Sequence, residues 1–218
     1  MIPLSPLLLS LKVASLATLA ALLLGTPIAW WLARGRFPGK AVVESIVVIP
    51  LILPPTVTGY YLLLLVGRRA TLGRFLEETF NTALIFTWQG AVLASTIAAL
   101  PLFIKATQGA FEGIDRRIED AGRTFKPALI VFATITLPVA WRGLLAGAIL
   151  AFARAMGEFG ITLMIAGSVP GRTQTLALAI YDAVQANQPH EANAMAILTT
   201  ATVLLLLVLV GRMTRVKY

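Results

Sequence analysis

Five long apolar runs dominate this chain of 218 residues. A helix needs about 20 mostly apolar residues to cross roughly 30 Å of hydrocarbon, and such runs lie at 8–33, 43–66, 84–106, 139–167 and 194–211. They are continuously apolar rather than alternating, which favours helices over barrel strands, because each lipid-embedded helix satisfies its own backbone. The sequence therefore predicts an all-α integral membrane protein, a single domain over 1–218 with five transmembrane helices. The low charged content, 13%, excludes an ordinary soluble domain.

The distribution of basic residues predicts the orientation of the chain. With five spans, the loops after the first and third spans share one face with the C-terminal tail. This face carries eleven basic residues: Arg34, Arg36, Lys40, Lys105, Arg116, Arg117, Arg123, Lys126, Arg212, Arg215 and Lys217. The other face carries four: Arg68, Arg69, Arg74 and Arg172. The positive-inside rule then places the N-terminus outside and the C-terminus and the loop 107–138 in the cytoplasm. Orientation accounts for the net charge of +8, so no nucleic-acid partner is expected.

The loop 107–138 contains a short amphipathic pattern. Phe111, Ile114, Ile118 and Phe125 recur at helical spacing, with Ala121 or Gly122 between the last two, and charges of both signs fill the opposite face. Pro127 is expected to end this helix. Such a helix lies on lipid or docks into a groove of another protein, and the mixed charge favours a protein partner.

The phrase "EDAGRTFK…ITLP" resembles the EAA loop of importer-type ABC transporter permeases. Asp120 takes the acidic position of that motif, and Ile135 opens its closing phrase. The resemblance implies a coupling helix that sits in a cleft of an ATP-hydrolysing subunit. Its residues are Glu119, Asp120, Ala121, Gly122, Arg123, Thr124 and Phe125. Two features depart from the motif: Lys126 replaces a glycine, and eight residues rather than nine separate it from Ile135. Glu119 and Asp120 both remain candidates for the key acid.

Two longer phrases resemble the permeases of molybdate and tungstate importers. They are "LARGRFPGKAVVESIVVIPLILPPTVTGYYLL" and "AILAFARAMGEFGITLMIAG", and sulfate permeases share the second in similar form. The resemblance implies an inner-membrane homodimer, two cytoplasmic ATPase subunits that bind ATP and magnesium, and an extracytoplasmic oxyanion-binding protein. A sulfate or thiosulfate importer is one alternative. An ion-coupled secondary transporter is another, although the sequence has no visible internal repeat.

The second apolar run is the predicted wall of the transport pathway. Its helix-breaking and hydroxyl residues are Pro54, Pro55, Thr56, Thr58 and Gly59. These prolines must kink or break the helix, and backbone groups freed at membrane depth are tolerated only where they meet protein or water.

Arg154 and Glu158 are the second pathway or gate candidates. They are four residues apart, so they face the same way on the fourth span and are close enough to pair. Lining the pathway and merely neutralising one another at a helix contact both remain open. In the same span a seam of small residues, Gly143, Gly147, Ala151 and Ala155, predicts close helix packing.

Catalytic and metal sites are not expected in this chain. It has no cysteine, its one histidine, His190, lies in a polar segment, and it lacks the G-x-x-x-x-G-K-[ST] phosphate loop. The predicted molecule is therefore a permease without a cofactor of its own.

Overall fold

The computed structural model describes residues 4–67, 70–80 and 84–214. Four basic residues of the charge count, Arg68, Arg69, Arg215 and Lys217, lie outside them. In chain order the helices are α1 (Leu4–Arg34), α2 (Lys40–Ile52), α3 (Pro55–Val66), α4 (Thr71–Phe80), α5 (Trp88–Glu112), α6 (Arg116–Arg123), α7 (Ala128–Val131), the π-helical turn η1 (Phe132–Thr136), α8 (Leu137–Met156), α9 (Gly160–Ala166), α10 (Leu176–Gln185) and α11 (Pro189–Thr214). The described part of the chain is thus all-α, as predicted.

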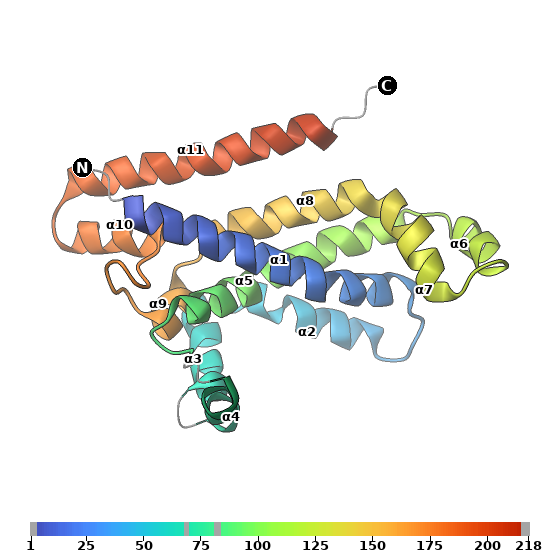
Figure 1. The fold of residues 1–218 in the computed structure, drawn as a ribbon, viewed down its shortest axis with the longest axis horizontal. Helices are drawn as coiled ribbons and strands as arrows, with labels where there is room; N and C mark the ends of the chain where they lie inside the picture. Colours follow the sequence, from blue (N-terminus) through green and yellow to red (C-terminus); the bar gives the residue numbers. More distant parts are fainter. Residues whose placement is uncertain (1–3, 68–69, 81–83, 215–218) are drawn as a thin grey trace.

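Helices α1, α5 and α8 lie side by side and form the body of the molecule (Figure 1). Their contact surfaces are rich in alanine: Ala17 of α1, Ala99 of α5 and Ala151 of α8 are fully buried around Phe103. Small side chains let membrane helices approach closely and pack well. This packing is needed because apolar burial gives no driving force for helix association within lipid. The predicted small-residue seam is part of this contact, because a Cβ on Gly147 would lie only 3.0 Å from the hydroxyl of Thr107.

Two ends of this body are used as landmarks below. The α6 end, where α1 finishes, carries α6 and α7 (Figure 1). The α10 end, where α1 begins, carries α9 and α10 (Figure 1).

Among the residues that the structure describes, four helical stretches are long and apolar enough to cross a membrane: Leu4–Arg34, Trp88–Glu112, Ala128–Met156 and Pro189–Val208. The predicted second span is a broken pair, α2 and α3, bent by 109°. The count reaches five when this pair is taken as one span, and the break falls at Pro54 and Pro55 as the prolines predicted. Helix α2 ends before Leu53, which is extended, and α3 begins at Pro55 with Pro54 as its N-cap, so the two prolines explain the interruption.

The predicted fourth span, 139–167, is wrong as a continuous helix. Its helical stretch begins earlier, at Ala128, and ends at Met156. Gly157 leaves the helical conformation, and the separate helix α9 follows. In the first turn of α9, the N–H of Ile161 donates a hydrogen bond to the carboxylate of Glu158. Near its start the stretch contains the π-helical turn, where the N–H of Leu137 donates to the carbonyl of Phe132. Pro138 explains the change of register, because it has no N–H to continue the regular ladder.

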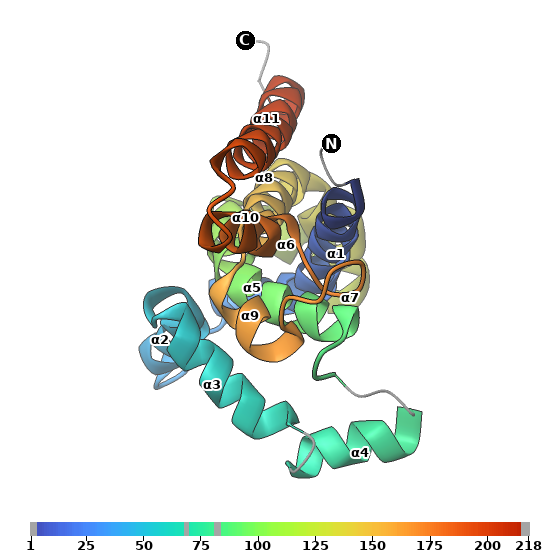
Figure 2. The ribbon, with the colours of Figure 1, turned by 90° about the vertical axis from the view of Figure 1, so that its left-hand side faces the viewer.

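The arm formed by α3 and α4 projects sideways from the body (Figure 2). Helix α3 packs against α9, and Leu62 of α3, Ile161 of α9 and Ala98 of α5 lie in one apolar cluster. The sequence did not predict α4 or α10 as separate helices, because each is too short to show as a membrane span. The exposed aliphatic side chains of α11, such as Ile197 and Leu204, suit contact with lipid.

Candidate functional site

Helix α6 is the predicted coupling helix, and it is shorter than the pattern implied. The prediction of one helix from Phe111 to Phe125 is wrong: α5 ends at Glu112, and Asp115 begins a new helix by accepting a hydrogen bond from the N–H of Arg117 at 2.9 Å. An aspartate in extended conformation satisfies a free N–H of the first turn, which explains the restart.

The break divides the predicted apolar face into two parts. Phe111 and Ile114 are buried in the body, in one cluster with Leu32 of α1. Ile118 is 48% exposed and Phe125 is 87% exposed. The inner pair anchors the loop to the body, whereas the outer pair is free to contact another molecule.

The turn after α6 is made without a left-handed residue. The N–H groups of Phe125 and Lys126 both donate to the carbonyl of Gly122, at 3.1 and 3.0 Å. In the described part of the chain, the residues other than glycine with positive φ are Phe86 and Asn187, so Lys126 replaces the motif glycine without strain. Pro127 does follow the helix, as the N-cap of α7.

Glu119 and Asp120 differ sharply in their surroundings. Asp120 is exposed, whereas Glu119 is buried and its Oε2 lies 2.8 Å from Nε of Arg34. Its other oxygen, Oε1, accepts a hydrogen bond from Thr136 at 2.8 Å. The Nε–H of Arg34 is not aligned for a hydrogen bond with any described residue, so the contact with Glu119 is an ion pair by distance.

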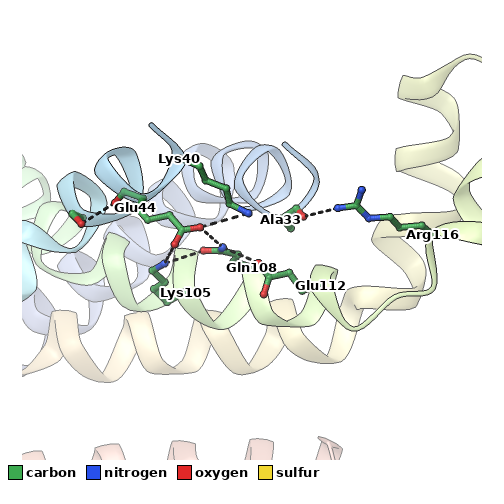
Figure 3. Close-up of polar contacts among 9 residues, drawn as sticks. Ala33, Lys40, Glu44, Lys105, Gln108, Glu112 and Arg116 are labelled. Atoms are coloured by element: carbon green, nitrogen blue, oxygen red, sulfur yellow. Dashed lines mark hydrogen bonds and ion pairs between the residues drawn. The ribbon is translucent and has the colours of Figure 1, made fainter. Parts of the chain in front are cut away.

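The importance of Arg34 for α6 was missed in the sequence, because Arg34 and Glu119 are far apart in the chain and no spacing rule joins them. Arg34 also donates from Nη2 to the carbonyl of Ile114 at 3.2 Å. In return Arg116 reaches the carbonyl of Ala33 at 3.5 Å (Figure 3). The end of α1 and the start of α6 are therefore tied together by polar contacts in both directions.

Gly122 explains why the motif requires small residues. A Cβ on Gly122 would lie 2.6 Å from Cδ1 of Ile135 and 3.3 Å from both methyl groups of Val131. Helix α6 therefore packs directly on α7 and η1, the segments that lead into α8.

The pathway candidates of the second span lie where α3 meets α9. Pro54 is the N-cap and Pro55 the first residue of α3. A Cβ on Gly160 would lie 2.6 Å from Cβ of Pro55, and one on Gly59 would lie 2.9 Å from Cβ of Met164. The break in the second span and the start of α9 are thus in close contact.

The hydroxyl residues at the break point in different directions. Thr56 is exposed, whereas Thr58 is buried and its hydroxyl has no hydrogen-bond partner among the described residues. Thr58 lines a largely apolar cavity of about 190 Å³ together with residues of α2 and α3 such as Pro50 and Tyr61.

Arg154 and Glu158 form the predicted pair, with Nη1 and Oε2 2.6 Å apart. The Glu158 side chain is 1% exposed, and its Oε1 accepts a hydrogen bond from the N–H of Ile161 at 2.8 Å. Glu158 therefore also holds the first turn of α9, the helix that begins at Gly160 after the break at Gly157. Glu158 thus contacts α9, the helix that packs on α3 next to Pro55, whereas α6 lies at the opposite end of the body (Figure 1).

A second polar network fixes α2 to α5 (Figure 3). Lys105 Nζ lies 3.3 Å from Oε2 of Glu44, and the side-chain amide of Gln108 donates to Glu44 and to Glu112, at 2.9 Å each. Lys40 approaches the same Glu44 carboxylate at 3.7 Å. Because α2 buries none of its own residues, this network is a main attachment of the first half of the broken span.

Within the described ranges 4–67, 70–80 and 84–214, no three histidine, aspartate or glutamate side chains lie close enough together to hold a metal ion. His190 is exposed in the first turn of α11.

Comparison with known proteins identifies the family. A family model described as "Binding-protein-dependent transport system inner membrane component" matches residues 25–216. The molybdenum transport system permease protein ModB of Escherichia coli strain K12 is 46% identical over 179 residues, 82% of this chain and 78% of that protein. The protein of the same name from Mycobacterium bovis is 38% identical over 210 residues, 95% of this chain and 78% of that protein.

Among solved structures, an inward-facing form of the MetNI methionine ABC transporter has the same fold. Its matched chain gives a TM-score of 0.73 at 18% identity, covering 98% of this chain and 95% of that one. The similarity of fold to an ABC importer and the similarity of sequence to the permeases above therefore agree. The chain belongs to the family of binding-protein-dependent transport system inner membrane components, among the molybdenum transport permeases of ABC importers.

Proposed function

We propose that this chain is the permease subunit of an ATP-driven importer of molybdate, with tungstate as a second tetrahedral substrate. The observation that carries the proposal is the 38–46% identity, over most of the chain, with proteins named molybdenum transport permeases. The exposed helix α6 supports it, because a permease without an ATP site needs a surface on which an ATPase can act. ATP and magnesium are then bound by partner subunits.

The proposed assembly contains two copies of this chain, two cytoplasmic ATPase subunits and an extracytoplasmic oxyanion-binding protein. Ile118, Phe125 and Leu129, exposed on and after α6, supply the apolar contacts to the ATPase. The α6 end is then cytoplasmic, with the N-terminus outside, the C-terminus inside and the spans in the inner membrane. This orientation agrees with the greater number of basic residues on that face.

The proposed pathway runs between the two copies along the α2–α3 face. This face carries exposed apolar side chains such as Ile46, Ile52, Tyr60 and Leu64, which one copy alone leaves uncovered. Arg154 and Glu158 hold the start of α9 behind it. The anion passes when the two copies alternate between outward-facing and inward-facing arrangements, driven by closure of the ATPases.

The test is ATP-dependent uptake of labelled molybdate into proteoliposomes that contain this chain, its ATPase and its binding protein. Inhibition by tungstate but not by an equal concentration of sulfate supports the proposal. Inhibition by sulfate instead would assign the chain to sulfate or thiosulfate import. Anion uptake by the permease without the ATPase would favour an ion-coupled secondary transporter.

A further inference from the structure

Helix α6 packs on Val131 and Ile135 at Gly122, but it buries none of its own apolar side chains. Among the described residues of α6, Glu119 is the one that is buried, and Ile118 faces outward. A helix of eight residues is marginal by itself, so its orientation depends on contacts with the rest of the protein. The buried contact that fixes it is therefore a carboxylate.

The Glu119 carboxylate is shared between two structural elements. Oε2 pairs with Arg34, the last residue of α1, and Oε1 accepts the hydroxyl proton of Thr136, the last residue of η1. The side chains of Arg34 and Glu119 are only 11% and 3% exposed. One side chain of α6 thus contacts α1 and the segment that continues into α8, two helices of the body.

A contact of this kind contributes more to orientation than to stability. The desolvation of two charges offsets most of the attraction in a buried ion pair, but removing one partner leaves an uncompensated charge. The hydrogen bond from Thr136 to Glu119 also has a preferred direction, unlike apolar contacts. Glu119 cannot contact a partner subunit as well, because it is buried, whereas the neighbouring Asp120 is exposed.

We propose that Arg34 and Glu119 are positioning residues that transmit movements of α6 to α1 and α8, so that ATP hydrolysis and anion transport stay coupled. This inference rests on the proposed function, in which an ATPase moves α6. Thr136 completes the joint by fixing the second carboxylate oxygen to η1. Thr136 ends the π-helical turn, which continues directly into α8, so a movement of α6 would reach α8 through this turn.

The experiment uses the full complex in proteoliposomes, with Glu119→Gln, Arg34→Gln and the double variant. Recovery of assembled complex, ATP hydrolysis and molybdate uptake are measured for each. We expect each single variant to hydrolyse ATP but to transport about tenfold less molybdate per ATP, a typical size for coupling between two sites. Glu191→Gln, which makes the same change at an exposed residue of α11, is expected to keep the wild-type ratio.

The double variant separates positioning from simple stabilisation. It leaves neither charge unpaired, so the recovery of complex is expected to return toward wild type. If transport per ATP returns with it, the pair is only structural and the proposal is overturned. If transport per ATP stays low in the double variant, the result supports Arg34 and Glu119 as positioning residues.

Two further outcomes keep the test decisive. Thr136→Val keeps the Arg34–Glu119 ion pair and the shape of the side chain but removes the hydroxyl group. This variant is expected to fold even if the charge variants do not assemble. An unchanged ratio of transport to ATP hydrolysis in Thr136→Val would overturn the proposal. Absence of ATP-dependent uptake by the wild-type complex would overturn the proposed function itself, and the joint with it.

Discussion

The close approach of α3 and α9 predicts that Gly160→Ala destabilises the protein. A Cβ on Gly160 would lie 2.6 Å from Cβ of Pro55, whereas carbon atoms in contact are about 3.5–4.0 Å apart. The two helices must therefore separate by about 1 Å at this point. The ring of Pro55 cannot move aside by changing rotamer, because it is closed onto the backbone.

The expected loss follows from two opposing effects. Inserting a methyl group into a packed contact costs about 1–3 kcal/mol. Replacing glycine by alanine restricts the unfolded chain and offsets about 0.4–1 kcal/mol. The free energy of unfolding is therefore expected to fall by about 1–2 kcal/mol.

Denaturant unfolding of the purified protein in detergent measures this change. Gly109→Ala is the matched control, because a Cβ there would meet no atom within 4 Å and Gly109 lies inside α5; its unfolding free energy should stay the same or rise by up to about 1 kcal/mol. The unfolding free energy of Gly59→Ala should fall between those of the other two variants, since the new Cβ would lie 2.9 Å from Cβ of Met164, a less severe approach than at Gly160. If Gly160→Ala is as stable as Gly109→Ala, the close contact at the break does not exist.

Three further predictions concern the two ends of the molecule. Replacing Ile118 and Phe125 together by Asp should abolish co-purification of the ATPase without lowering the unfolding temperature, because both side chains are exposed; retained ATPase would place the docking surface elsewhere. Glu158→Gln should lower the unfolding free energy by roughly 1.5–3 kcal/mol through loss of the charged contact with Arg154, and unchanged folding and uptake together would exclude a gating role. Glu44→Gln should speed proteolysis at α2, since it weakens the attachment of that helix to α5; an unaltered digestion pattern would show that apolar contacts suffice.

Most of the spans and the break at Pro54 and Pro55 could be predicted because they depend on local sequence, whereas the end of the fourth span at Met156 could not. A run of apolar residues has to be long enough to cross the bilayer wherever it lies. The adjacent Pro54 and Pro55 interrupt the helix, whereas the single Pro50 lies inside α2. The Arg154–Glu158 pair follows from helical spacing alone.

The attachment of α6 could not be predicted in the same way. The helical periodicity from Phe111 to Phe125 predicted a single helix, because periodicity does not show that Asp115 is the N-cap of a new helix. The contact of Glu119 with Arg34 depends on how α1 and α6 are placed in space. The motif also drew attention to Asp120, the exposed acid, and said nothing of the burial of its neighbour.

The distribution of packing indicates where the molecule can move. The contact of α1 with α5 and α8 is made of fully buried alanines and Phe103, and such close-packed surfaces do not deform continuously. Charged contacts of three carboxylates, Glu44, Glu119 and Glu158, contribute instead to holding α2, α6 and the turn before α9. A contact of two or three polar groups can break and reform as a unit, whereas a seam of small residues cannot. The body of α1, α5 and α8 is therefore expected to move as one rigid piece, with rearrangement concentrated at α2, at α6 and at the turn from α8 to α9.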